Sequence, residues 1–237
     1  MRRGCDGAPR GGGDGAAVGG PGVPLGGFVG DAGGVRLAEG GGGGGWRIEV
    51  GDRQAMTLML WLRDASGMTP DLDPPIPPLE PPVAVVPELV ELVGPQATAQ
   101  WTGLWLGLWE GRLEDWFALE MLAPPRFELL NRSPQLRRLF AAAFEDAAGW
   151  SNEHRPVGPG VVGRPGAPAR EPGSVVKQLE GELGRRARDF AFAIAVLPVA
   201  GRVFWMLPDG GLVVSEGLMR DGRAFRALLY DVLASLV

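Results

Sequence analysis

Glycine is unevenly distributed along the 237 residues, and this limits which part of the chain can fold. The first 45 residues hold 20 of the 39 glycines and end in a run of six, Gly40 to Gly45. Glycine loses more backbone entropy on folding than any other residue, and this segment has few large apolar side chains to offset the loss. We therefore expect a disordered leader over residues 1–45 and a single domain over residues 46–237.

Charge argues against a nucleic-acid partner. The formal net charge is −5, and nine carboxylates lie between Asp71 and Glu120 beside one arginine, Arg112. Nucleic-acid binders usually concentrate basic residues on one face, because phosphate neutralisation supplies much of their affinity. The longest apolar stretch is only 12 residues, 190–201, whereas a bilayer-spanning helix needs about 20. We expect neither a nucleic-acid nor a membrane partner.

Cysteine, histidine and lysine are each present once. Cys5 lies in the leader, so the sequence predicts no intrachain disulfide and no Cys/His zinc site. Lys177 is the only lysine among 23 basic residues, a bias typical of a GC-rich bacterial genome. These features favour a cytoplasmic protein of such a bacterium, with no metal and no cofactor.

The N-terminal part of the domain predicts a hairpin followed by a proline-rich strap. Residues 46–50 alternate apolar and polar side chains, as a strand with one buried face does. The near-continuous apolar run 56–62 predicts a second strand, with a helix as the alternative. Between residues 70 and 87, eight prolines predict an extended polyproline II strap or linker.

Helical spacing dominates the middle of the chain. Trp101, Trp105 and Trp109 recur with Leu104 and Leu108 on one predicted helical face, although a strand over 99–111 is the alternative. Residues 113–121 predict a second helix. Ser133 and Pro134 begin the clearest helix, with one apolar stripe formed by Leu136, Leu139, Phe140, Ala143, Phe144 and Ala147.

The C-terminal part predicts strands between two helices. A proline- and glycine-rich loop over 151–173 precedes a helix that Ser174 would cap. The segments 190–196, 203–207 and 212–215 predict three strands in an antiparallel meander, and Asp221 would cap a closing helix. The expected fold is therefore α+β: an antiparallel sheet, made of the N-terminal hairpin and the C-terminal three-stranded meander, packed with four to five helices.

Two short patterns and the single histidine carry little chemical weight. Residues 158–163 spell G-x-G-x-x-G, but prolines flank them where a dinucleotide site needs a strand and a helix. His154 stands at the start of the predicted loop, where an exposed structural histidine is the more common interpretation. Asp71 and Asp73 form a D-x-D pair that leads into prolines, with no phosphate-binding loop nearby. None of these patterns predicts an active site.

Two further groups are the candidate sites. Gly103, Gly107 and Gly111 fall opposite the tryptophans at four-residue spacing and predict either a close internal contact or a smooth ridge for a second subunit. Glu216 directly follows a predicted strand, and Arg202 and Arg220 could complement its charge.

The leading hypothesis is a non-catalytic protein-interaction module, with a protein partner or a homodimer. The competing hypothesis is a small enzyme using Glu216 as acid or base and Arg202 or Arg220 to hold an anionic substrate. A deep pocket beside Glu216 would favour the enzyme.

Overall fold

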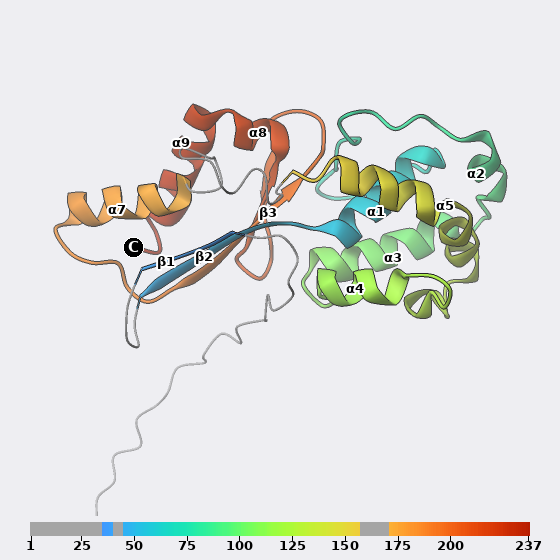
Figure 1. Ribbon diagram of the computed structural model, residues 1–237, viewed down its shortest axis with the longest axis horizontal. Coiled ribbons are helices and arrows are strands. Elements are labelled where there is room, and N and C mark those ends of the chain that lie inside the picture. The colour runs from blue at the N-terminus through green and yellow to red at the C-terminus, as the bar shows by residue number, and fades with distance from the viewer. Residues whose placement is uncertain (1–34, 40–44, 157–170) are drawn as a thin grey trace, which may run out of the picture.

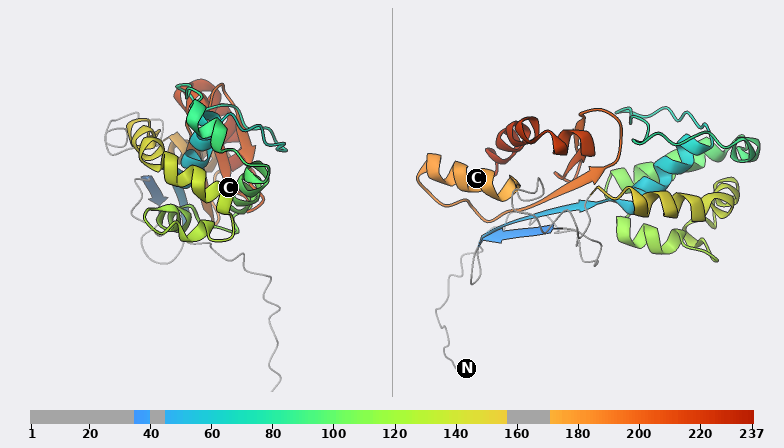
Figure 2. Two further views of the ribbon diagram at one scale, coloured as in Figure 1. Left: turned by 90° about the vertical axis from the view of Figure 1, so that its right-hand side faces the viewer. Right: turned by 45° about the horizontal axis from the view of Figure 1, so that its top comes forward.

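The computed structural model describes residues 35–39, 45–156 and 171–237, which form two packed regions (Figure 1). In one region the C-terminal helices cover one face of a sheet, and in the other the remaining helices pack beyond the strand ends (Figure 2). The strands are β1 (Val35–Glu39), β2 (Trp46–Asp52), β3 (Ala191–Leu197), β4 (Phe204–Met206) and β5 (Leu212–Ser215). The helices are α1 (Gln54–Ala65), α2 (Pro87–Leu92), α3 (Ala97–Trp109), α4 (Asp115–Leu122), α5 (Pro134–Glu153), α7 (Glu171–Leu183), α8 (Glu216–Arg220) and α9 (Gly222–Leu233), with a 3-10 helix, η1, at Glu128–Leu130.

The sheet is mixed, which corrects the antiparallel sheet expected from the sequence. Its order is β1-β2-β3-β5-β4, in which β2, β3 and β5 run parallel and the outer strands β1 and β4 are antiparallel to their neighbours. The hairpin of β4 and β5 is confirmed, but β5 lies beside β3, so the three strands do not form a meander. The apolar run of β3 suits a central strand with parallel neighbours, whereas apolar spacing by itself carries no information on strand direction.

The helices outnumber those expected, because α1 replaces a predicted strand and the short helices α2 and α8 were not predicted. The fold is α+β, with eight α-helices in the described residues instead of four to five. Ten of the twelve residues of α1 are buried, so it is a core helix without a wet face. The backbone N–H groups of Ala55 and Met56 donate to the Asp115 carboxylate at 3.2 and 3.1 Å, and Asp115 thereby caps α1 from the first residue of α4. The expected N-terminal hairpin is therefore wrong.

The tryptophan segment is a helix, which excludes the strand alternative. Trp101, Trp105 and Trp109 are buried on one face of α3, and their rings stack in sequence at 5.3 and 5.8 Å between centroids. The Trp101 indole N–H also donates to the carbonyl of Met59 in α1 at 2.7 Å. Spacing of four residues and a buried hydrogen-bond partner together fix α3 against α1.

Two hydrophobic cores hold the fold together. The first lies among α1, α3, α4 and α5, and includes every stripe residue predicted for α5, with Phe144 only partly buried. The second lies between the sheet and α7, α8 and α9.

Asp221 caps α9 as predicted, since it accepts from the N–H of Ala224 at 3.1 Å. Helix α7 begins at Glu171, three residues before the predicted cap. Residues 157–170 of the predicted loop lie outside the described residues.

Strand β1 falls inside the segment expected to be a disordered leader, so that expectation does not hold for residues 35–39. The strand pairs antiparallel with β2, and Leu37 packs against the core beneath α7. We expect a chain that begins at residue 45 to unfold about 4 to 8 °C below one that begins at residue 34, because burial of one leucine contributes about 2 kcal/mol. Thermal unfolding of the two truncations, followed by circular dichroism, measures the difference. Equal melting temperatures would show that β1 adds nothing.

Candidate functional site

A pocket opens where the sheet meets the helical region. Its cavity volume is about 430 Å³, and its walls come from the proline-rich strap, the end of α5, the segment after β3, and α8. The lining residues are Glu80, Pro81, Pro82, Glu153, His154, Arg155, Val199, Glu216, Gly217 and Arg220. The volume falls within the range of small-molecule sites.

The pocket lies at the carboxyl ends of the parallel strands. Val199 follows β3, Glu216 follows β5, and Asp52, the last residue of β2, pairs with the lining residue Arg155. Open sheets with parallel strands bind ligands in the crevice beyond these strand ends, because the connecting segments diverge there. The place of this pocket in the fold is therefore one where ligand sites recur.

The strap forms one wall, and buried polar contacts fix it in place. The Arg63 guanidinium donates to the carbonyls of Ile76 and Pro77 at 2.9 and 2.8 Å and forms an ion pair with Asp64 at 2.6 Å. Asp64 accepts from the Leu79 N–H at 2.7 Å. Further along, the Glu80 N–H donates to the carbonyl of Pro198, so the strap is joined to both regions of the fold. The wall is thus rigidly positioned for residues 80–82.

His154 is held by the helix that it follows. Its backbone N–H and its ring Nδ1 both contact the carbonyl oxygen of Trp150, at 3.0 and 2.8 Å, and its ring stacks on the Trp150 indole at 4.4 Å. A carbonyl oxygen can only accept, so Nδ1 must carry the proton of this hydrogen bond. In the neutral ring Nε2 is then a proton acceptor, and the hydrogen bond at the other nitrogen fixes this tautomer.

Arg155 is held by a carboxylate from the sheet. Its Nε and Nη2 donate to the two Asp52 oxygens at 2.7 and 3.2 Å, a bidentate arrangement across 103 residues of sequence. The Asp52 side chain is 2% exposed and that of Arg155 is 26% exposed. Such planar pairing orients the guanidinium at the pocket wall and also neutralises its charge.

Glu216 and Arg220 form the third charged element of the pocket. The Arg220 Nη2 donates to Glu216 at 2.5 Å across one turn of α8. Ser215 caps this helix by accepting from the Leu218 N–H at 3.2 Å, and it also donates to the carbonyl of Gly201 at 2.8 Å. A Cβ at Gly217 would lie 2.6 Å from that same carbonyl oxygen, so the close approach of the chains requires glycine there.

Two of the predicted candidate residues line the pocket and one does not. Glu216 and Arg220 are both at its wall, as the sequence-based alternative placed them near each other. Arg202 is instead paired with Asp221, the cap of α9, at 2.6 Å. His154 also lines the pocket, although its sequence context favoured a structural role.

The predicted glycine ridge is only partly a helical face. At Gly103 a Cβ would meet nothing within 4 Å, and at Gly107 it would meet only the Leu113 Cβ, at 3.8 Å. Gly111 lies beyond the end of α3 with φ +69°, a left-handed conformation that ends the helix. Among the described residues, nothing packs on Gly103, and only Leu113 contacts Gly107.

The sequence analysis did not associate Glu80, Glu153 or Arg155 with a site. Each lies in a segment predicted to be a strap or a loop, where exposed charged side chains are common. The one available signal was Asp52, a carboxylate at the end of a buried strand. The G-x-G-x-x-G pattern at 158–163 lies outside the described residues.

Comparison with known proteins leaves the geometry of the site as the only guide to function. No family model, curated protein or solved structure matches this chain. Within the described part of the chain, no helix combines the length and apolar character needed to cross a bilayer. In the same residues, no three or more His, Cys, Asp or Glu side chains are grouped so that they could hold a metal ion.

Proposed function

We propose that the protein binds a small polar molecule in the pocket at the carboxyl edge of the sheet, and that His154 exchanges a proton with it. The observation that carries this proposal is the convergence, in one pocket, of the only histidine with two oriented charge pairs, Asp52–Arg155 and Glu216–Arg220. A histidine with one ring nitrogen anchored and the other able to accept is the arrangement that general bases use.

The surroundings of His154 hold its ring in one orientation at the pocket wall. The Trp150 carbonyl accepts from Nδ1, and the indole ring beneath the imidazole attracts a cation. The ring also lies at the carboxyl end of α5, the negative pole of a 20-residue helix. In this proposal Nε2 is the ring nitrogen that accepts a proton from an O–H or N–H of the bound molecule, while Glu216 and Arg220 orient the molecule by hydrogen bonds.

A single histidine makes the test specific. In untagged protein we expect the Cε1–H nuclear magnetic resonance signal to shift saturably with at least one of four 10 mM probes of about equal size: putrescine, succinate, butane-1,4-diol or inorganic phosphate. Nitrogen correlation spectra should show Nδ1 protonated in the neutral ring, and the bound probe should move the midpoint of the histidine titration.

Two variants separate the pocket from its surroundings. Glu216→Gln should weaken binding of the active probe, whereas Arg202→Gln, on the neighbouring pair outside the pocket, should not. A His154 signal unmoved by all four probes, or a ring protonated at Nε2, would overturn the proposal.

The interaction hypothesis stays as a second proposal, on one observation. Gly103 is exposed on α3, and a Cβ there would face no described atom within 4 Å. A protein partner or a second copy of the chain, in the cytoplasm of a bacterium, is the occupant that the sequence analysis predicts for the glycine face of α3.

A further inference from the structure

The positive charges of the pocket are already matched by the protein. Asp52 holds Arg155 through two hydrogen bonds, and Glu216 holds Arg220 through one. An anion entering the pocket would have to compete with a carboxylate at each arginine. The anionic substrate expected from the sequence therefore has no unpaired guanidinium among the described residues that line the pocket.

The negative charges of the pocket are not matched. Glu80 and Glu153 both line it, one on the strap and one at the end of α5, and neither forms an ion pair within the described residues. With the two arginines compensated, these two carboxylates give the described lining residues a net negative charge. In a concave site such charges act together on a molecule that enters.

Helix α5 adds to this field. The helix spans 20 residues and directs its carboxyl end at the pocket, and its last turn contains no basic residue. Unpaired carbonyls at a helix carboxyl end carry a partial negative charge that favours cations and disfavours Glu153 itself. A bound cation would relieve the repulsion between Glu153 and the helix end.

The remaining lining atoms fit a short carbon chain. Pro81, Pro82 and Val199 supply the apolar side chains of the lining. Because the described residues hold no group of three metal-ligand side chains, an organic cation fits this lining better than a metal ion does.

We propose that the molecule bound in the pocket is an organic cation, an alkylamine whose ammonium group lies between Glu80 and Glu153 and whose carbon chain lies on Pro81, Pro82 and Val199. This inference rests on the proposed function and specifies its ligand class. His154 Nε2 then faces an N–H donor, from which a neutral imidazole accepts a hydrogen bond.

The matched probes test the charge directly. Putrescine, succinate and butane-1,4-diol share a four-carbon skeleton and differ in charge, so their titrations against the His154 signal isolate that variable. We expect putrescine to saturate and the other two to bind at least about tenfold more weakly, a difference typical of one charge-assisted hydrogen bond. Binding should weaken as sodium chloride is raised from 20 to 500 mM, because the carboxylates are exposed to solvent.

Matched variants then locate the ammonium group. Glu80→Gln and Glu153→Gln should each raise the putrescine dissociation constant by about five- to tenfold. Glu145→Gln, an exposed glutamate on α5 away from the pocket lining, should leave it unchanged. All three substitutions are at exposed positions, so thermal unfolding should confirm an intact fold.

Results other than those expected distinguish failure of the organic-cation inference from failure of the proposed function. Tighter binding of succinate, phosphate or the diol would overturn the inference and leave the proposed function standing. Binding of putrescine that neither Glu80→Gln nor Glu153→Gln weakens would overturn the location. If none of the probes moves the histidine signal, both proposals fail.

Discussion

Replacing Trp105 with alanine is expected to lower the free energy of unfolding by about 3 to 5 kcal/mol. The indole is 2% exposed and lies between the rings of Trp101 and Trp109, so truncation removes two stacked contacts and leaves a cavity inside the helical core. Urea unfolding followed by far-ultraviolet circular dichroism measures the loss, since the substitution itself alters tryptophan fluorescence.

Trp116 provides a matched control for this substitution. It is 41% exposed on α4, and Trp116→Ala should cost no more than about 1 kcal/mol. Similar losses for Trp105→Ala and Trp116→Ala would contradict the burial on which the first core depends.

Gly103 tests the opposite face of α3. Nothing described lies within 4 Å of a Cβ there, so Gly103→Leu should fold normally and gain up to about 1 kcal/mol of helix propensity. If this face instead contacts a second copy of the chain, the variant should lose the dimer in sedimentation experiments while remaining folded. A monomeric wild-type chain would remove the homodimer proposal.

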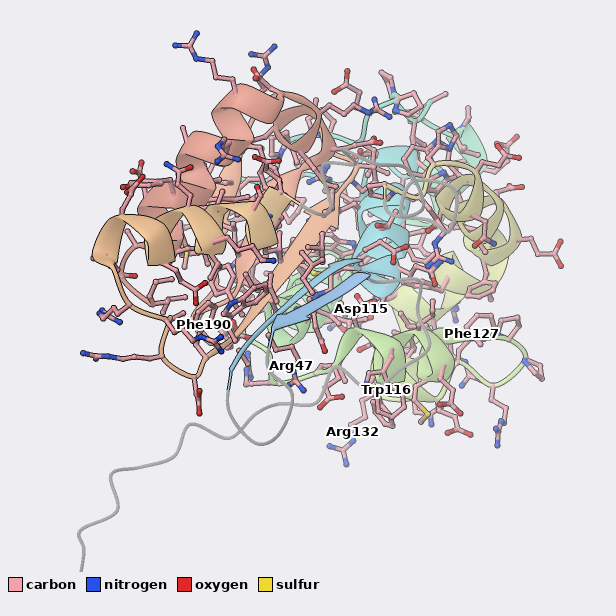
Figure 3. All side chains as sticks on the ribbon, turned by 60° about the vertical axis from the view of Figure 1, so that its left-hand side comes forward. Arg47, Asp115, Trp116, Phe127, Arg132 and Phe190 are labelled. Carbon is pink, nitrogen blue, oxygen red and sulfur yellow. The ribbon has the colours of Figure 1, made fainter. Side chains whose placement is uncertain are left out.

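The second large effect concerns Asp115, which connects α4 to the start of α1 (Figure 3). The residue as a whole is half-buried, but its carboxyl group is buried. This burial raises the pKa of the carboxyl from an ordinary value near 3.8 to about 6. The charge of Arg53 and the hydrogen bonds from the two backbone N–H groups act in the opposite direction and lower the pKa. The folded state thus binds a proton more tightly than the unfolded state does.

The sign of the pH dependence follows from this difference. Between about pH 4 and pH 6 the folded carboxyl is protonated and the unfolded one is ionised, so raising the pH through this window lowers the free energy of unfolding. From the two pKa values, the contribution lost is about 3 kcal/mol. It is fully present below pH 4 and absent above pH 6.

Asp115→Asn isolates this contribution from other titrating groups. The stability of the wild type relative to that of Asp115→Asn should increase by about 3 kcal/mol when the pH falls from 7 to 4. Asp146→Asn, at an exposed position of α5, should follow the wild type throughout. Parallel stability curves for the wild type and Asp115→Asn would show that the carboxyl is not perturbed. Asp115→Ala should lose a further 1 to 2 kcal/mol or so at every pH, since the first N–H groups of α1 then lack their acceptor.

Local patterns in the sequence predicted the features that depend on neighbouring residues. The apolar stripe of α5, the cap that Asp221 gives to α9, and the hairpin of β4 and β5 each involve contacts between residues a few positions apart. Helical spacing likewise brought Trp101, Trp105 and Trp109 to one face of α3. Such features can be predicted because side-chain spacing and capping act within a single element.

Only the tertiary structure decided the features that depend on distant segments. The run 56–62 suits a strand as well as a helix, and it became α1 because its buried surroundings and the Asp115 cap come from residues far along the chain. The direction of β5 was set by its place beside β3, which no spacing pattern encodes. The pocket brings together Glu80, His154 and Glu216, and its Asp52–Arg155 pair spans 103 residues, so its chemistry exists only where separate segments meet.

The sequence by itself determined which segments could be helices, caps and turns, because these depend on local spacing. Strand direction and the composition of the site were decided by packing between segments that the sequence keeps apart.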